Sequence, residues 1–307
     1  MSNFVGKRYW YFLITLVILI PCIVSLAVNG LKPSIDFTGG AAMELQFERA
    51  VLPSEVRDVF VDAGYSDTAV TNVGDDRTVM IRMKEVDEQV KIDLEKKLTE
   101  KFGPLTELYF RSVGPSVGKE VTQSAFTAIA VAAAVIVLFI LVSFRKVPNA
   151  IRYGVCAVVA ILQNILVVAG LFSILGWLLG WEVDALFLTA VLTVIGFSVQ
   201  DIIVVFDRIR ENIPKRRGED YETIVNRSLL ETLHRSLATQ LNAMFVLVAL
   251  LLFGGATIKQ FVLVLLVGML SETYASLFSA VPLLVVWEKG EIGGFFRRLF
   301  KGRPATA

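Results

Sequence analysis

Long uncharged runs alternate with short charged segments along most of the chain. A membrane-spanning helix needs about 20 apolar residues to cross roughly 30 Å of hydrocarbon. Six runs reach or approach this length, at 9–31, 121–144, 153–181, 185–206, 236–258 and 260–287. Asp201 interrupts the fourth run and Glu272 the sixth. The pattern predicts an α-helical, polytopic membrane protein with six transmembrane helices.

The segment between the first and second runs has the polar composition of a soluble domain. Alternating and helical periodicities predict strands at 42–47, 68–73, 78–83 and 105–113, and helices at 53–63 and 86–102. Gly74, Asp75 and Asp76 are expected to form the turn between the two middle strands. The order βαββαβ is typical of a ferredoxin-like α+β domain. We call residues 32–120 the insert.

The distribution of cations predicts the orientation of the six helices. Lys and Arg gather near residues 7–8, 145–152, 208–235 and 289–303, whereas the opposite loops carry Glu182, Asp184 and Lys259. Because cations near span ends stay cytoplasmic, both termini are expected in the cytoplasm and the insert outside it. A cleaved signal peptide is the alternative for the first run, since 25–27 resembles a cleavage site, but removal would place the termini on opposite sides.

This topology predicts four parts. They are a cytoplasmic N-terminus with the first transmembrane helix (1–31), the extracytoplasmic insert (32–120), a five-helix transmembrane bundle (121–287) and a basic cytoplasmic tail (288–307).

Composition narrows the classes of function. The chain is 55% hydrophobic and 19% charged, its mean hydropathy is +0.64, and its net charge of +1 gives no basic excess for nucleic acid. Cys22 and Cys156 lie in apolar runs without metal-ligand spacing, and His234 is the one histidine. We therefore expect no catalytic residues, no metal and no cofactor, and we interpret the insert as a binding or coupling module.

Charged residues inside the apolar runs are the candidates for function, because each costs at least about 2.5–3.5 kcal/mol to insert. Asp201 is predicted to accept a proton, with a structural salt bridge as the alternative. Arg235, at the start of the fifth run, is either a topology anchor or the partner of Asp201. Glu272 is expected near the middle of its run, in a different part of the membrane from Asp201, and either hydrogen-bonded or on a proton path.

A charged segment follows the fourth run. Its members are Asp207, Arg208, Arg210 and Glu211. Such a segment is either a solvated helix end or a contact for a cytoplasmic partner.

Five motifs in order resemble the SecF branch of the SecD/SecF family, within the resistance-nodulation-division superfamily. They are SIDFTGG (34–40), VGPSVGKEV (113–121), TVIGFSVQDIIVVFDRIREN (193–212), TLHRSL (232–237) and LFGG (252–255). The sequence departs from the family at Glu272, where a small residue is common, and at Ser34, where glycine is common.

The resemblance implies an inner-membrane subunit that pairs with SecD. Together they would use the proton gradient to pull unfolded preproteins outward past the SecYEG channel, while SecA pushes from inside. YajC is a further possible partner. Membrane lipid would surround the spans. Asp201 and Arg235 match family residues implicated in proton conduction. Four glycines at the edges of the insert are interpreted as hinges or as turn residues: Gly39, Gly40, Gly114 and Gly118.

Three other functions stay open from the sequence. A small-molecule or lipid exporter of the same superfamily would carry both halves of the bundle in one chain. An intramembrane aspartyl hydrolase would need a second carboxyl group beside Asp201. A non-conducting scaffold for channel assembly would tolerate the loss of Asp201.

Overall fold

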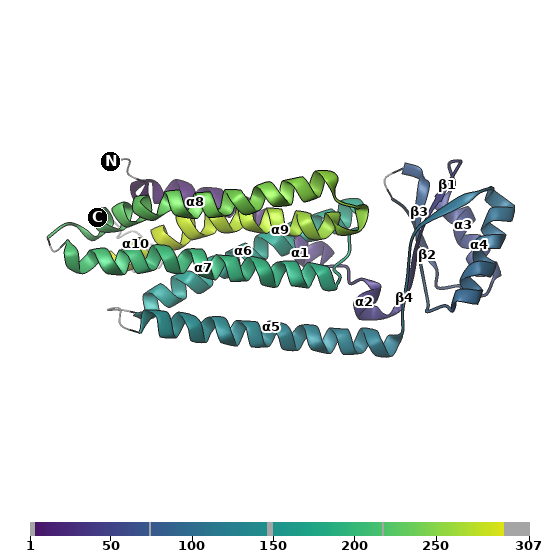
Figure 1. Cartoon of the computed structure of the whole chain (residues 1–307), viewed down its shortest axis with the longest axis horizontal. Coiled ribbons are helices and arrows are strands. Elements are labelled where there is room, and N and C mark those ends of the chain that lie inside the picture. Colours follow the sequence, from purple (N-terminus) through teal and green to yellow (C-terminus); the bar gives the residue numbers. More distant parts are fainter. Residues whose placement is uncertain (1–3, 74, 146–149, 217, 292–307) are drawn as a thin grey trace, which may run out of the picture. The chain divides into compact units, whose positions relative to one another are not determined.

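The computed structural model of the chain describes residues 4–73, 75–145, 150–216 and 218–291. Its elements are η1 (Val5–Lys7), α1 (Arg8–Asn29), α2 (Ile35–Thr38), β1 (Gly40–Phe47), α3 (Pro53–Asp62), β2 (Ala69–Val73), β3 (Asp75–Met83), α4 (Glu88–Phe102), β4 (Leu105–Val113), α5 (Pro115–Phe144), α6 (Ala150–Leu179), α7 (Ala185–Lys215), α8 (Tyr221–Phe253), α9 (Ala256–Tyr274), η2 (Ala275–Ala280) and α10 (Val281–Glu288). All named strands lie between α1 and α5 (Figure 1). The predicted basic tail lies outside the described residues from residue 292 onward.

Six helical segments are long and apolar enough to cross a membrane. They are Val5–Asn29, Pro115–Ser143, Ala150–Leu179, Ala185–Lys215, Tyr221–Phe253 and Ile258–Glu288. These segments contain most of each uncharged run, so the prediction of six spans is confirmed and the chain is a multi-pass membrane protein. Several helices run past their apolar part, because Lys, Arg and Glu are good helix formers outside hydrocarbon.

The insert contains a four-stranded sheet with the order β2-β3-β1-β4, and every neighbouring pair is antiparallel. Along β3 the buried residues Val79, Ile81 and Met83 alternate with more exposed ones, as the pleat of a half-buried strand requires. These residues share one apolar core with Phe60 of α3 and Leu98 of α4, and both helices lie on the same face of the sheet (Figure 1). The predicted order βαββαβ is therefore present.

Two local features differ from the sequence prediction. The short helix α2 precedes β1 and was not predicted; the Ser34 side chain caps it by accepting the Asp36 N–H. Strand β3 begins at Asp75, three residues earlier than predicted, so Asp75 and Asp76 belong to the strand. The Asp75 carboxylate accepts the N–H groups of Arg77 and Thr78, which accommodates the irregular register between β2 and β3. Gly74, the first residue of the predicted turn, lies outside the described residues.

The chain divides into two compact units. The bundle unit comprises residues 1–28, 130–171 and 189–307, and the insert unit comprises 29–129 and 172–188. The insert unit therefore includes the end of α6 and the first turn of α7, beyond the predicted boundaries of 32–120.

Burial is uneven among the apolar helices. Half of the most apolar stretch of α6 is buried within the chain, whereas only 6% of the most apolar stretch of α5 is buried. In the bundle unit the apolar core joins Ile202 and Phe206 of α7 to Leu229 of α8 and Leu284 of α10. Cys22 and Cys156 are buried free thiols, as expected of packing residues in apolar runs.

Candidate functional site

Three membrane-spanning segments of the bundle unit bring polar side chains together. Helix α7 contributes Asp201, α8 contributes Gln240, and the sixth span contributes Glu272 and Ser276. All four residues are buried, with Glu272 and Ser276 fully inaccessible to solvent. Because polar groups in hydrocarbon must find partners, the four residues form a candidate functional site.

Ser276 is the hydrogen-bond partner of Asp201. Its hydroxyl donates to Asp201 Oδ2 over 2.6 Å. The bond gives the buried carboxylate a donor, which a polar group inside a membrane span needs. The contact therefore links the charge of α7 directly to the sixth span.

Glu272 has a different partner. The Gln240 amide donates from Nε2 to Glu272 Oε2 over 2.5 Å. The second oxygens, Glu272 Oε1 and Gln240 Oε1, have no hydrogen-bond partner among the described residues. Both oxygens remain available to further donors.

The expectation that Glu272 lies in a different part of the membrane from Asp201 was wrong. The two carboxylates are close enough for their charges to interact, and Ser276, one helical turn beyond Glu272, contacts Asp201. Asp207 and Lys259, the charged residues that follow Asp201 and precede Glu272, lie at different distances from the two acids and so suggest different depths. Counted from the first residues of α7 and α9, both acids come 16 residues later, which is about 24 Å of helix rise in each case.

A π-helical turn begins three residues after Glu272. Segment η2 (Ala275–Ala280) separates α9 from α10, and Pro282 is the second residue of α10. Proline has no N–H and its ring crowds the carbonyl four residues earlier, so a regular α-helix cannot pass through this point. The wider π turn accommodates the break, and such turns are frequent at functional sites.

Arg235 shares a cavity with Asp201. The cavity has a volume of about 50 Å³ and is lined by Phe197, Gln200, Asp201, Val204, Arg235, Ser236, Thr239 and Gln240. Within the described part of the chain, however, no ion pair shorter than 4.0 Å joins Arg235 to Asp201. Arg235 is exposed, as are Gln200 and Thr239. The geometry thus places the arginine near the carboxylate, while Ser276 makes the direct contact.

The charged end of α7 is paired within the chain. Arg208 contacts Glu211 on its own helix and Glu231 on α8, at 2.9 and 2.6 Å. Arg210 pairs with Asp207 at 2.6 Å. The Arg208–Glu231 pair joins α7 to α8, and all these side chains are partly exposed, so the segment still presents charge at the surface.

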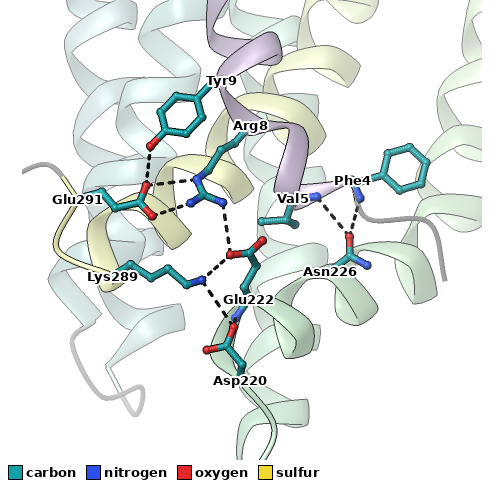
Figure 2. Close-up of polar contacts among 9 residues, drawn as sticks. All are labelled: Phe4, Val5, Arg8, Tyr9, Asp220, Glu222, Asn226, Lys289 and Glu291. Carbon is teal, nitrogen blue, oxygen red and sulfur yellow. Dashed lines mark hydrogen bonds and ion pairs between the residues drawn. The ribbon is translucent and has the colours of Figure 1, made fainter. Parts of the chain in front are cut away.

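A second cluster of ion pairs joins three parts of the bundle unit (Figure 2). Arg8 of α1 lies between Glu222 of α8 and Glu291, at 3.3 and 2.5 Å, and Lys289 contacts Glu222. The hydrogen bond and charge of Glu222 raise the pKa of Lys289. This cluster, which the sequence analysis did not predict, brings the start of α1 to the end of α10. Both ends of the described chain therefore lie at the same end of the bundle.

The glycines at the edges of the insert are closely packed. Gly39 and Gly40 have positive φ angles of 72° and 119°, which side chains rarely adopt. A Cβ on Gly118 would lie 2.8 Å from the Gly39 nitrogen, and one on Gly114 would lie 3.3 Å from Glu85 Oε1. Close packing is thus a demonstrated reason for glycine here, and the hinge role stays a prediction.

Comparison with known families gives two matches. The profile of "Protein export membrane protein SecD/SecF, C-terminal" matches residues 93–290, and that of the "SecD/SecF GG Motif" matches residues 24–51. The second range contains Gly39 and Gly40, and the first contains all four residues of the candidate site.

Individual relatives extend the similarity to the whole chain. The protein translocase subunit SecF of Anaerolinea thermophila is 46% identical over the full length of both proteins. SecDF of Bacillus subtilis is 33% identical over 94% of this chain and 38% of its own length. The crystal structure of SecDF, a translocon-associated membrane protein from Thermus thermophilus, superposes with a TM-score of 0.80 at 31% identity, covering 94% of this chain and 39% of that one. The chain thus spans about two fifths of the SecDF proteins that it matches.

Proposed function

The chain belongs to the SecD/SecF protein-export family, and from this premise we propose that it is a non-enzymatic subunit that, with SecD, uses the proton gradient to drive late preprotein translocation. Asp201 takes and releases the proton, Glu272 binds protons beside it, and Arg235 stabilises the ionised state. The preprotein emerges unfolded from the SecYEG channel, to which SecA delivers it, and YajC is a further partner of the complex.

The observation that carries this proposal is the pair of carboxyl groups on α7 and the sixth span. Two neighbouring carboxylates in a medium of low dielectric rarely carry two charges at once, so proton binding and helix packing depend on each other. Protonation of Asp201 removes the charge that the Ser276 hydroxyl stabilises, and the π turn is a point where the sixth span can repack.

SecD is the proposed partner within the membrane. The relatives named SecDF carry the matching region as about two fifths of one longer chain, which supports a separate chain supplying the rest here. Helices α7 and α8 also expose Gln200, Thr239 and Asn242 within apolar spans. Polar side chains facing lipid are costly, so a second bundle covering them is favourable.

We further propose the inner membrane as the location, with both termini in the cytoplasm. The cation distribution supports this orientation, and the ion pairs of Arg8 and Lys289 support a common side for the two termini. The insert is then an extracytoplasmic, ferredoxin-like domain, for which the order βαββαβ and the sheet order β2-β3-β1-β4 are the support. The domain boundaries at residues 31, 120 and 287 belong to this proposal.

The test uses inverted vesicles that contain the export channel, SecD and this chain, loaded with a preprotein stalled late in transit. ATP is exhausted, a proton gradient is imposed, and protected full-length preprotein is counted. We expect completion by the wild type and failure by Asp201→Asn, which keeps the shape and deletes the titration. Asp93→Asn, the same change on the exposed face of α4, is the matched control and should complete normally.

Each rival function predicts another outcome at equal complex levels. Normal completion by Asp201→Asn would indicate a scaffold, and no dependence on this chain would leave the exporter of the same superfamily. The approach of Glu272 to Asp201 also supplies the carboxyl pair that an aspartyl hydrolase requires. Preprotein fragments that disappear in both Asp201→Asn and Glu272→Gln would overturn the proposal in favour of hydrolysis.

A further inference from the structure

A buried carboxylate lies in the segment between α1 and the insert sheet, within the insert unit. Asp36 belongs to α2 and is only 4% exposed. A buried charge is costly unless it is both paired and hydrogen-bonded. Its partners therefore show which parts of the chain it holds together.

Asp36 bridges the sheet and the start of α7. Its Oδ1 forms an ion pair with Arg111 of β4 at 3.0 Å. Its Oδ2 accepts the N–H of Ala185, the first residue of α7, over 3.2 Å. The start of a helix carries partial positive charge, so this position favours a carboxylate.

Backbone bonds fix the same segment against the loop before α7. The Ser34 N–H donates to the Val183 carbonyl and the Val183 N–H donates to the Lys32 carbonyl, each over 2.8 Å. The loop residue Asp184 in turn accepts the Phe187 N–H over 2.7 Å and so caps α7. The segment at 32–36 and the start of α7 are thus held as one piece.

The other end of the segment is packed on α5. Thr122 donates its hydroxyl to the Phe37 carbonyl over 3.2 Å, and Gly39 lies in close contact with Gly118. Strand β1 begins at the next residue, Gly40. A displacement of α7 at its first turn therefore reaches the sheet through two residues, Asp36 and Arg111.

Helix α7 also carries Asp201. The helix runs without interruption from Ala185 to Lys215, and Asp201 lies about 24 Å along it from Ala185. Backbone hydrogen bonds connect the two positions along the helix, so α7 is a continuous path from Asp201 to Ala185.

We propose that Asp36 is a positioning residue that transmits the movement of α7 to the insert, by holding the Ala185 N–H and the Arg111 guanidinium at once. This inference rests on the proposed function and adds the element that couples proton binding to the domain outside the membrane. In this scheme Asp36 passes on a displacement.

The test separates proton movement from transport. Proteoliposomes containing SecD and this chain report proton flux with a pH-sensitive dye, and the stalled-preprotein vesicles report gradient-driven completion. Asp36→Asn can still accept the Ala185 N–H but loses the ion pair, and Asp36→Ala loses both contacts. We expect both variants to keep proton flux, with completion reduced about tenfold by Asn and further by Ala.

Variants of Arg111 provide a second test, because they leave the contact between Asp36 and α7 unchanged. Arg111→Gln should reproduce the uncoupling, and Arg111→Lys, which keeps the charge, should restore most of the completion. Asp67→Asn is the matched control, because it removes an ion pair with Lys84 inside the insert and leaves Asp36 untouched.

Four outcomes decide the inference. Uncoupling by Asp36→Asn and Arg111→Gln, but not by Asp67→Asn, supports it. A parallel loss of proton flux and preprotein completion would make Asp36 a structural residue. Normal completion in all variants would leave Asp36 without a role in transmission. Either result overturns the inference. Normal completion by Asp201→Asn in the same vesicles would refute the proposed function itself, so the two failures are distinguishable.

Discussion

Removal of the Ser276 hydroxyl is the sharpest perturbation of the membrane site. Ser276→Ala deletes the 2.6 Å hydrogen bond to Asp201 and leaves the rest of the π turn in place. Ser279 lies in the same turn, is nearly as buried, and shares its hydroxyl with Thr15 instead, at 3.2 Å. Ser279→Ala is therefore a matched control for the loss of one buried hydroxyl.

The size of the effect follows from the hydrogen bond that is lost. Hydrogen bonds between membrane helices contribute about 0.6 kcal/mol on average and about 1.7 kcal/mol at most. Since about 1.4 kcal/mol corresponds to a tenfold change in an equilibrium constant, the loss changes the equilibrium between packings of α7 on the sixth span by roughly 3- to 16-fold. The bond joins α7 to the sixth span, so its loss should lower the rate of completion by a factor of that size.

The assay is the rate of gradient-driven completion at one fixed proton gradient. Ser276→Ala should lower the rate by the factor above, and Ser279→Ala should leave it within the error of the wild type. Equal losses in both variants would show that the effect comes from the π turn as a whole. An unchanged rate in Ser276→Ala would refute a role of the Ser276–Asp201 contact in coupling.

Two further predictions concern packing and pH. Gly170→Ala should lower the free energy of unfolding by about 1–3 kcal/mol, because the added Cβ would lie 2.2 Å from the Cys22 Cβ. Gly196→Ala is the control, since a Cβ there meets nothing within 4 Å. Thermal denaturation in detergent compares the two variants. Burial and the neighbouring Glu107 raise the pKa of Glu95 to about 7. The folded insert therefore binds this proton more tightly than the unfolded chain does, and the free energy of unfolding falls as pH rises from about 4.5 to 7. Glu95→Gln should flatten that fall, as measured by thermal denaturation at pH 5 and pH 8, and an unchanged slope would contradict the shift.

The spans and the insert elements could be predicted because each depends on a local pattern. An uncharged run of sufficient length has one stable state in hydrocarbon, since every backbone polar group must be bonded within the segment. The strands and helices of the insert likewise follow from alternation, helical spacing and the Pro53 and Gly103 boundaries. The early start of β3 was missed because it depends on side-chain bonds made by Asp75, which no periodicity records.

The members of the site could be named from sequence, but their contacts could not. Asp201 and Glu272 are conspicuous as charges in apolar runs. Their proximity depends on where each helix begins, and charged residues are poor markers of that point because polar helix ends continue beyond the membrane. The choice of Ser276 over Arg235 as the direct partner of Asp201 depends on helix packing and on the π turn, which follow from tertiary structure.

Asp36 was missed although its sequence contains a usable signal. It lies between the apolar residues Ile35 and Phe37, in a segment that the GG-motif profile includes, and an acid in such a setting needs buried partners. Only the fold shows that those partners are the first N–H of α7 and an arginine of β4.

The positions of Asp201 and Asp36 on or against one helix simplify the proposed coupling. A signal that travels through many side chains is weakened at every loose contact, whereas α7 connects the two positions through its own backbone hydrogen bonds. The element that yields must then lie on the other side of the Asp201 contact, and the π turn, a local break in the regular α-helix, is suited to that role. In this scheme proton binding changes how α7 packs against the sixth span, and the rigid helix delivers the change to the Ala185 N–H, where Asp36 receives it.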